Sequence, residues 1–267
     1  MKTGNYLITK SILTSFIVAF TMSMANSQNL TINTRAGINY TTLWNKNIDG
    51  TMGLEIQSSL SKKFSYGSFY GVDGNLKVNR YLTISLGIIR ANQNQSYSVK
   101  NEQFYYQTTT QLNNQLDYLD IPLFFRFYIK SFYLEFGPQV GFLLGAHENY
   151  DGSAYRDVSS SFKPVNFMLN GGAGFRIELP GRFSMTSGFR MGAGLTDVTK
   201  EYSSSMKIPE DASIITKLAH FKVENEDWLG ILLGYNTTYK SFSYNKTQRC
   251  HIGFNISVGY DLFRTKK

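Results

Sequence analysis

The feature that most constrains the fold is an alternation of apolar and polar residues with a period of two, repeated in long segments. In residues 131–146 the even positions are all apolar, whereas the odd positions are mostly small or polar. Successive side chains of a β-strand point to opposite faces of a sheet. This segment therefore predicts a strand with one apolar face and one polar face, which is typical of a membrane barrel.

Eight segments show the same alternation and are predicted to be strands: 30–40, 66–78, 81–91, 117–130, 131–146, 165–180, 182–195 and 249–263. Three connections, at 79–80, 130–131 and 180–181, are very short. The others, at 41–65, 92–115, 147–163 and 196–248, are long and polar. Short turns on one side and long loops on the other indicate an outer-membrane barrel with periplasmic turns and extracellular loops. We predict an all-β, antiparallel, up-and-down transmembrane β-barrel of eight strands.

Two alternatives concern the strand count and the environment. Residues 229–240 can form a strand, and a membrane-spanning hairpin within 196–248 would give ten strands instead of a long outer loop. A soluble barrel or sandwich would turn the apolar face inward, and alternation alone does not exclude it. The length of the strands, the purity of the apolar face and the asymmetry of the connections favour the membrane.

The N-terminus has the pattern of a secretory signal peptide. Lys2 and Lys10 form a basic region, residues 11–24 are apolar, and Ala25 and Ser27 favour cleavage before Gln28. We expect residues 1–27 to be a cleaved signal peptide and residues 28–267 to be a single barrel domain. The predicted location is the bacterial outer membrane.

The charge of the chain bears on its partners. The formal net charge of +8 falls to +6 when Lys2 and Lys10 leave with the signal peptide, and the remaining charges are scattered. A basic balance can indicate nucleic acid, but export excludes that partner. Outer-membrane lipid and lipopolysaccharide are the expected partners.

Charged residues of both signs occupy the predicted inward face. They are the basic residues Arg35, Lys77, Arg126, Arg176, Arg182 and Arg190 and the acidic residues Asp73, Asp120, Glu135, Glu178 and Asp261. The interior of an eight-stranded barrel only just holds its side chains, and unpaired buried ions cost several kcal/mol each. We therefore predict a lumen closed by an ion-pair network rather than a conducting pore, with Asp120, Arg126 and Glu135 as the foremost partners.

Catalytic signals are weak. Of the three histidines, His147 and His220 fall in predicted loops and His251 faces inward; no HExxH, GxSxG or Cys-His pattern is present. Asp151 and Asp157 lie near His147, so a loop-based enzyme is the least favoured alternative. We expect no enzyme activity and no catalytic, cofactor or metal site.

Single residues carry three smaller predictions. Pro122 and Pro138 lie within strands, where proline removes a ladder hydrogen bond, and are predicted to mark bulges or register adjustments. Cys250, the only cysteine, is expected to face lipid as a small hydrophobe. The glycines at 171, 172 and 174 are expected to make room for arginine and tyrosine neighbours.

A family resemblance adds to this interpretation. Residues 116–128, LDYLDIPLFFRFY, and 134–144, LEFGPQVGFLL, resemble the paired IP and GP strands of the PorT-like outer-membrane β-barrel family of Bacteroidetes, and segments at 79–90, 174–198 and 253–263 are similar too. The resemblance implies an outer-membrane barrel of about eight strands. It does not imply one activity, although the family's namesake serves protein secretion.

The loops and the last strand suggest partners. Residues 92–115 are rich in Asn, Gln, Ser, Thr and Tyr, which suits a protein or glycan ligand and equally suits an inert cover. Tyr260 and Phe263 are candidate signals for the barrel-assembly machinery, although four residues follow Phe263. The expected function is a structural or interaction protein acting through its surface loops. The alternative is a narrow channel or a transport component, including a protein-secretion accessory.

Overall fold

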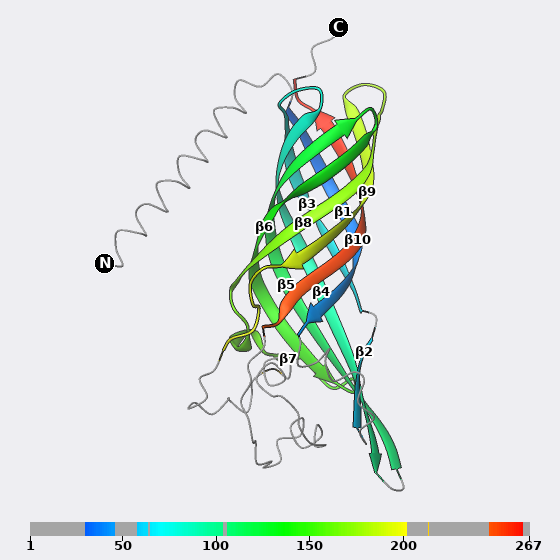
Figure 1. The fold of residues 1–267 in the computed structure, drawn as a ribbon, viewed down its shortest axis with the longest axis vertical. Coiled ribbons are helices and arrows are strands. Elements are labelled where there is room, and N and C mark those ends of the chain that lie inside the picture. The colour runs from blue at the N-terminus through cyan, green and yellow to red at the C-terminus, as the bar shows by residue number, and fades with distance from the viewer. Residues whose placement is uncertain are drawn as a thin grey trace, which may run out of the picture.

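The computed structural model describes residues 30–45, 58–63, 65–103, 106–201, 213 and 246–263. These residues form a tall antiparallel barrel (Figure 1). The predicted signal peptide, most of the stretch 196–248, the candidate strand at 229–240 and His220 lie outside the described residues.

Eight strands form the wall of the barrel. They are β1 (Leu30–Trp44), β3 (Ser65–Lys77), β4 (Leu82–Gln103), β5 (Tyr106–Ile129), β6 (Phe132–Tyr150), β8 (Val165–Glu178), β9 (Phe183–Gly194) and β10 (Gln248–Asp261). Neighbours along the chain pair in antiparallel fashion, and β10 closes the ring by pairing with β1 from Thr31↔Asp261 to Trp44↔Gln248. The predicted eight-stranded barrel is confirmed. Because β9 pairs directly with β10, the wall has no place for the additional hairpin of the ten-strand alternative.

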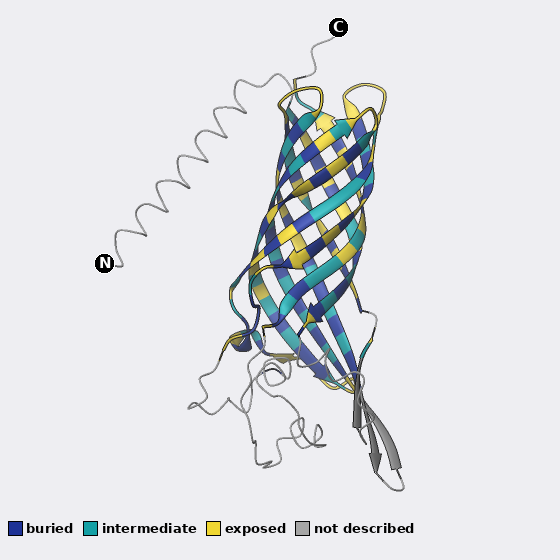
Figure 2. Cartoon of the chain, viewed as in Figure 1, coloured by how far each residue is buried: buried dark blue, intermediate teal, exposed yellow. Residues whose placement is uncertain are grey.

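The outer face of the wall is apolar and the inner face is polar. Ile38, Tyr66, Ile129 and Phe189 are each about two-thirds exposed on the outside. Exposed and buried positions alternate along each strand (Figure 2). A soluble barrel would place these large hydrophobic side chains inside, so that alternative is wrong. No helix in the described part of the chain is long and apolar enough to cross a membrane.

The two ends of the barrel differ. One end, here called the turn end, carries the tight connections 78–81, 130–131 and 179–182 together with the first residue of β1 and the last residue of β10 (Figure 1). The opposite end, the loop end, carries the long connections. There, β7 (Arg156–Asp157) pairs with β6, and a 3₁₀ turn, η1 (Ser159–Ser161), follows it.

The stretch 92–115, predicted to be a loop, is instead a continuation of β4 and β5. The two strands remain paired as far as Gln103↔Tyr106, and β2 (Ser58–Lys63) adds a third strand by pairing with β4 from Ser58↔Asn101 to Lys63↔Ser96. These strand segments lack the alternation of apolar and polar residues, because a strand pair beyond the lipid does not need an apolar face. The result is a three-stranded projection from the loop end (Figure 1), here called the projection.

The prolines do not shift the register, contrary to the prediction. Between β5 and β6 the pairs Pro122↔Gln139 and Phe125↔Phe136 belong to one register, and the only shift lies between Asp117 and Tyr118. Proline removes an N–H donor and therefore interrupts the ladder locally. It adds no residue to the strand, so the pairing resumes unchanged.

Candidate functional site

The centre of the lumen is organised around Glu135 on β6. Its Oε2 atom accepts a hydrogen bond from Nε of Arg126 at 2.8 Å, and its Oε1 atom accepts from Nε of Arg190 at 2.8 Å. Arg126 also donates through Nη1 to Oδ1 of Asn75 at 2.7 Å. All three charged side chains are buried. One carboxylate thus bridges β5, β6 and β9 across the interior.

Asp73 on β3 extends this arrangement toward β1. Its carboxylate lies 3.1 Å from Nε of Arg35 and 3.7 Å from Nη1 of Arg126. Asn33 and Ser85 also donate to it, at 3.2 and 3.3 Å. Asp73 therefore joins the first strand of the barrel to the Glu135 group.

A second ion pair lies closer to the loop end. Arg249 on β10 donates to both oxygens of Asp120 on β5, at 2.9 and 2.8 Å, and its guanidinium carbon lies 3.9 Å from the centre of the Tyr118 ring. Gly141 makes room for the pair, because a Cβ at that position would lie 2.6 Å from Asp120 Oδ1 and 2.8 Å from Arg249 Nη1. Bidentate geometry is the strongest form of arginine–carboxylate pairing.

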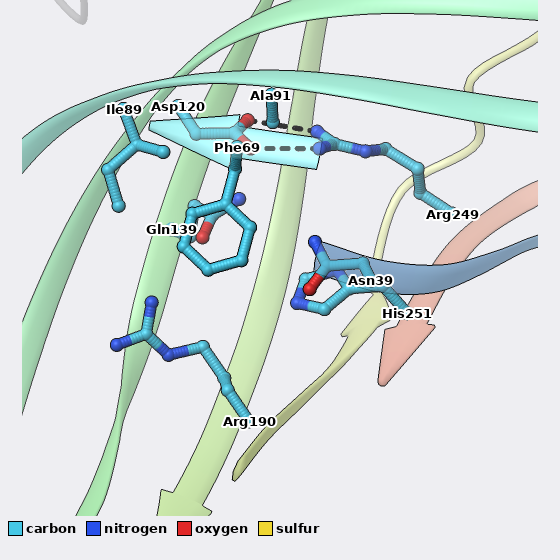
Figure 3. A pocket seen from close by; sticks show the side chains of 9 residues that line it. All are labelled: Asn39, Phe69, Ile89, Ala91, Asp120, Gln139, Arg190, Arg249 and His251. Atoms are coloured by element: carbon cyan, nitrogen blue, oxygen red, sulfur yellow. Dashed lines mark hydrogen bonds and ion pairs between the residues drawn. The ribbon is translucent and has the colours of Figure 1, made fainter. Parts of the chain in front are cut away.

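Seven residues form these ion pairs and are here called the lumen network. They are Arg35, Asp73, Asp120, Arg126, Glu135, Arg190 and Arg249. The space between the two ion-pair groups measures about 20 Å³, and Phe69, Gln139 and His251 contribute to its lining (Figure 3). That volume is sufficient for about one water molecule. Phe124 fills further space, with the Arg190 guanidinium carbon 4.1 Å from its ring centre.

A cluster of buried apolar side chains, here called the cap, lies at the loop end of the barrel. It consists of the buried side chains Leu43, Tyr97, Leu112, Leu116, Tyr118, Ala146, Val158, Phe162 and Val198. Polar contacts hold the surrounding segments in place: Arg156 Nη2 lies 2.9 Å from Glu148 Oε2, and Asp197 accepts hydrogen bonds from the backbone N–H groups of Thr199 and Thr247 at 3.2 and 3.0 Å. Apolar side chains from four wall strands and from the connecting residues Val158, Phe162 and Val198 therefore meet at this end.

The eleven charged residues predicted to line the lumen fall into two groups. Six belong to the lumen network: Arg35, Asp73, Asp120, Arg126, Glu135 and Arg190. The other five lie at the turn end. Among these, Arg176 lies 2.8 Å from Glu178 and 3.8 Å from Asp261, whereas Lys77 and Arg182 are exposed and form no ion pair with any described residue. Arg182 donates to the Leu262 carbonyl oxygen at 3.3 Å instead.

One member of the network was missed by the sequence analysis, and one expected pairing differs. Arg126 and Glu135 pair with each other, but Asp120 pairs with Arg249. Arg249 is the second residue of β10 and has the same parity as His251 and Asn255, which face inward. Extending the alternation by one more step toward the N-terminal end of that strand would have identified it.

The residues considered for catalysis have structural contacts. Asp157 faces His147 across the β6–β7 pair and accepts hydrogen bonds from the backbone N–H and the hydroxyl of Ser159, at 2.8 and 2.6 Å, which lower the pKa of Asp157. The Ser159 hydroxyl also accepts from the backbone N–H of Ala146 at 2.8 Å. These bonds hold Ser159 in the wall of the cap and occupy its hydroxyl. Within the described ranges no three His, Cys, Asp or Glu side chains gather as a metal site.

The remaining candidate residues lie at or near the lipid face. Tyr260 points outward on β10 and packs edge-on against Phe183, with ring centres 5.2 Å apart. Phe263 follows the strand and is half exposed. Cys250 shares the outward parity of Ile252 and is partly exposed.

Comparisons with known proteins agree with this geometry. A family model described as "outer membrane protein beta-barrel domain" matches residues 25–200. A search among curated proteins finds no match. The crystal structure of Neisserial surface protein A is similar at 10% identity, covering 86% of this chain and 96% of that one, with a TM-score of 0.37.

Two further solved structures are similar at comparable levels. The outer membrane protease OmpT from Escherichia coli shares 8% identity over 89% of this chain and 98% of that one, with a TM-score of 0.37. The translocator domain of the autotransporter NalP from Neisseria meningitidis shares 11% identity over 94% and 97%, with a TM-score of 0.27. Likenesses this weak carry no argument about activity.

Proposed function

Because this chain belongs to the outer membrane protein beta-barrel domain family, we propose that it is a closed outer-membrane anchor acting as an interaction protein through the surface at its loop end. In barrels of this kind the short turns face the periplasm and the longer connections face the outside. The projection of β2, β4 and β5 is then extracellular.

The paired charges inside the barrel carry this proposal. Glu135 and Asp73 join side chains from β1, β3, β5, β6 and β9 across the interior, and the apolar cap lies beyond them. A conducting channel would need a continuous wet path, and burying charges without partners costs several kcal/mol per ion. Paired charges and an apolar cap suit a sealed barrel.

The projection supports the interaction role. β4 and β5 contain 22 and 24 residues, whereas β9 contains 12. Leu112 is the residue of β5 nearest the loop end that pairs with β6. Beyond it, among the described strands, β5 pairs with β4, and β4 pairs in turn with β2. Tyr97 of β4 and Leu112 of β5 still belong to the cap. The part of the sheet beyond them continues past the wall and is available for contacts outside the membrane.

Single-channel recording in planar bilayers tests the sealed lumen. The purified full chain is expected to show no stable conductance step. A Glu135→Ala, Asp73→Ala variant that still shows the heat-dependent gel shift of a folded barrel is expected to show brief openings, because its arginines lose their counter-charges. A wide, stable conductance in the unmodified chain would replace this proposal with the channel or secretion-accessory alternative.

A shortened hairpin tests the interaction role. Lys100 and Thr109 face each other in the β4–β5 ladder, so replacing residues 101–108 with Asn-Gly joins them through a two-residue turn. Tyr97 in the cap remains. Binding to arrayed glycans and to host or neighbouring bacterial cells is expected to fall with the shortened chain. Equal binding by both chains would contradict the proposal.

We further propose that the loop-end residues have no catalytic role, because the Ser159 hydroxyl is already hydrogen-bonded on both sides. Lipid-modifying and proteolytic assays are expected to give the same result for the unmodified chain and for His147→Ala. An activity that His147→Ala abolishes would restore the enzyme alternative.

A further inference from the structure

The turn end contains a pocket that the closed-anchor function does not use. Its volume is about 340 Å³, which lies within the usual range for small-molecule sites. It lies where the turns after β3 and β5 meet the last residues of β8. Its lining includes Lys77, Arg80, Lys130, Arg176 and Glu178.

The wall holds these side chains near one another. Lys77 pairs with Thr83 at the start of β4, and the backbone N–H of Tyr128 donates to the Tyr81 carbonyl oxygen at 2.7 Å. The backbone N–H of Arg176 donates to the Ser131 carbonyl oxygen at 2.7 Å. The turns are therefore hydrogen-bonded to the barrel wall, which keeps the backbone positions of these basic residues close to one another.

The charges of the pocket are unbalanced. Arg176 has the carboxylates of Glu178 and Asp261 at 2.8 and 3.8 Å. Lys77, Arg80 and Lys130 form no ion pair with any described residue. The Arg80 guanidinium carbon lies 4.4 Å from the centre of the Tyr81 ring. In the lumen network, by contrast, every arginine faces a carboxylate. Three uncompensated cations around one hollow repel one another, and an anion bound between them would remove that repulsion.

We propose that this pocket binds a phosphoryl group. Lysine ammonium groups and the arginine guanidinium are the side chains that recognise phosphate, through charge-assisted hydrogen bonds. A phosphate ester carries its charge on several acceptor oxygens, so it can contact Lys77, Arg80 and Lys130 together, whereas a single carboxylate has two oxygens and one charge. The group belongs either to a phospholipid headgroup or to a free phosphate compound.

Calorimetric titration with inorganic phosphate tests the site in the full chain, held in dodecyl maltoside micelles, which contain no phosphate. The Lys77→Gln, Lys130→Gln variant is expected to bind phosphate at least about tenfold more weakly than the unmodified chain, because it lacks two of the three cations that would form charge-assisted hydrogen bonds with the anion. The matched control is Arg90→Gln, Lys200→Gln, which removes the same charge from exposed residues outside the pocket. This control is expected to bind as the unmodified chain does.

Native mass spectrometry separates the two sources of the phosphoryl group. If a headgroup is the ligand, phosphatidylglycerol stays bound to the unmodified chain and to the control but not to the Lys77, Lys130 variant. If a free compound is the ligand, the calorimetric difference appears without selective lipid retention. All variants are checked by the heat-dependent gel shift of a folded barrel. If neither measurement distinguishes the Lys77, Lys130 variant from the control, the proposal is wrong.

Discussion

Glu135 serves as the counter-ion of two buried arginines, Arg126 and Arg190. Removing one partner of a buried ion pair costs about 3–5 kcal/mol, because the remaining charge stays buried without compensation. Glu135→Gln is therefore expected to lower the free energy of unfolding by an amount of that order. Urea unfolding of the barrel in lipid vesicles, followed by tryptophan fluorescence, measures the change.

Glu178→Gln is the matched control for that experiment. Glu178 also pairs with an arginine, but its side chain is half exposed at the turn end, and exposed ion pairs contribute about 0–1 kcal/mol. A similar loss of stability in both variants would show that burial does not set the strength of these pairs.

The Arg249–Asp120 pair permits a double-mutant cycle. Arg249→Gln alone leaves a buried carboxylate and Asp120→Asn alone leaves a buried guanidinium, so each single change is expected to destabilise strongly. The double variant leaves two neutral side chains, and its loss is expected to be smaller than the sum of the single losses by at least about 1 kcal/mol. Additive losses would mean that the two groups do not interact as their 2.8 Å separation indicates.

At this scale the sequence predicts which residues face inward but not which of them meet. Parity places Asp120, Arg126 and Glu135 on the polar face, and it would have placed Arg249 there too. The partner of Asp120 depends on the curvature of the closed wall, which brings β10 across the lumen to β5, 129 residues away in the chain. Alternation along single strands contains no information about that distance. It also does not show where the lumen ends, so Lys77 and Arg182 were assigned to a network that lies deeper.

At the scale of strands, two glycines in the wall differ in what they allow. A Cβ on Gly137 of β6 would lie 1.9 Å from the Leu123 carbonyl oxygen, whereas a Cβ on Gly171 of β8 would lie 3.9 Å from its nearest neighbour, the Glu135 carbonyl oxygen. Gly137→Ala is expected to destabilise by about 1–3 kcal/mol, the usual cost of overpacking. Gly171→Ala is expected to be tolerated. Thermal gel-shift midpoints of both variants check this, and equal midpoints would contradict it.

The end of β10 is the candidate signal for assembly. We propose that Tyr260 and Phe263, both exposed on the outer surface, are recognised by the assembly machinery. Tyr260→Ala, Phe263→Ala is expected to reduce insertion into the outer membrane, as measured by fractionation. Phe183→Ala removes the ring that packs against Tyr260 while leaving both candidate residues in place, and it should insert normally. Insertion of the double variant at the unmodified level would refute the signal.

Strand lengths show a limit of pattern analysis at this scale. Hydrophobic alternation marks only the part of a strand that meets lipid, so the predicted boundary near Ala91 falls short of Gln103, where β4 ends. Leu112, Leu116 and Tyr97 hint at the continuation, because they fill the apolar cap. Their spacing among Asn, Gln and Thr is too sparse to be distinguished from a loop.

For the whole molecule, the apolar outer face is the property that determines its environment. An arginine on the lipid face costs about 2–4 kcal/mol at the bilayer midplane. Phe189→Arg, at the middle of β9, is expected to show a loss of that size in vesicle unfolding. Tyr155→Arg replaces an equally exposed aromatic side chain outside the strands and is expected to show almost none. Equal effects would mean that Phe189 does not face lipid.

The architecture as a whole was predictable because one repeated signal specifies it. Alternation gave the eight wall segments, and the three short connections gave the antiparallel order. The cap was not predictable, because it combines side chains from β1, β4, β5 and β6 with Val158, Phe162 and Val198 from connecting segments. Those connections have no periodicity from which their position can be inferred.

The lumen network has a consequence for how the barrel closes. A slip of two residues between neighbouring strands keeps every side chain on its own face, so the apolar exterior does not oppose it. Such a slip changes the stagger of the sheet, and with it the tilt of the strands and the width of the barrel. It also moves one strand past the other by about 7 Å, which separates Arg126 from Glu135. The charges inside the barrel thus select one stagger among several that the lipid would accept equally.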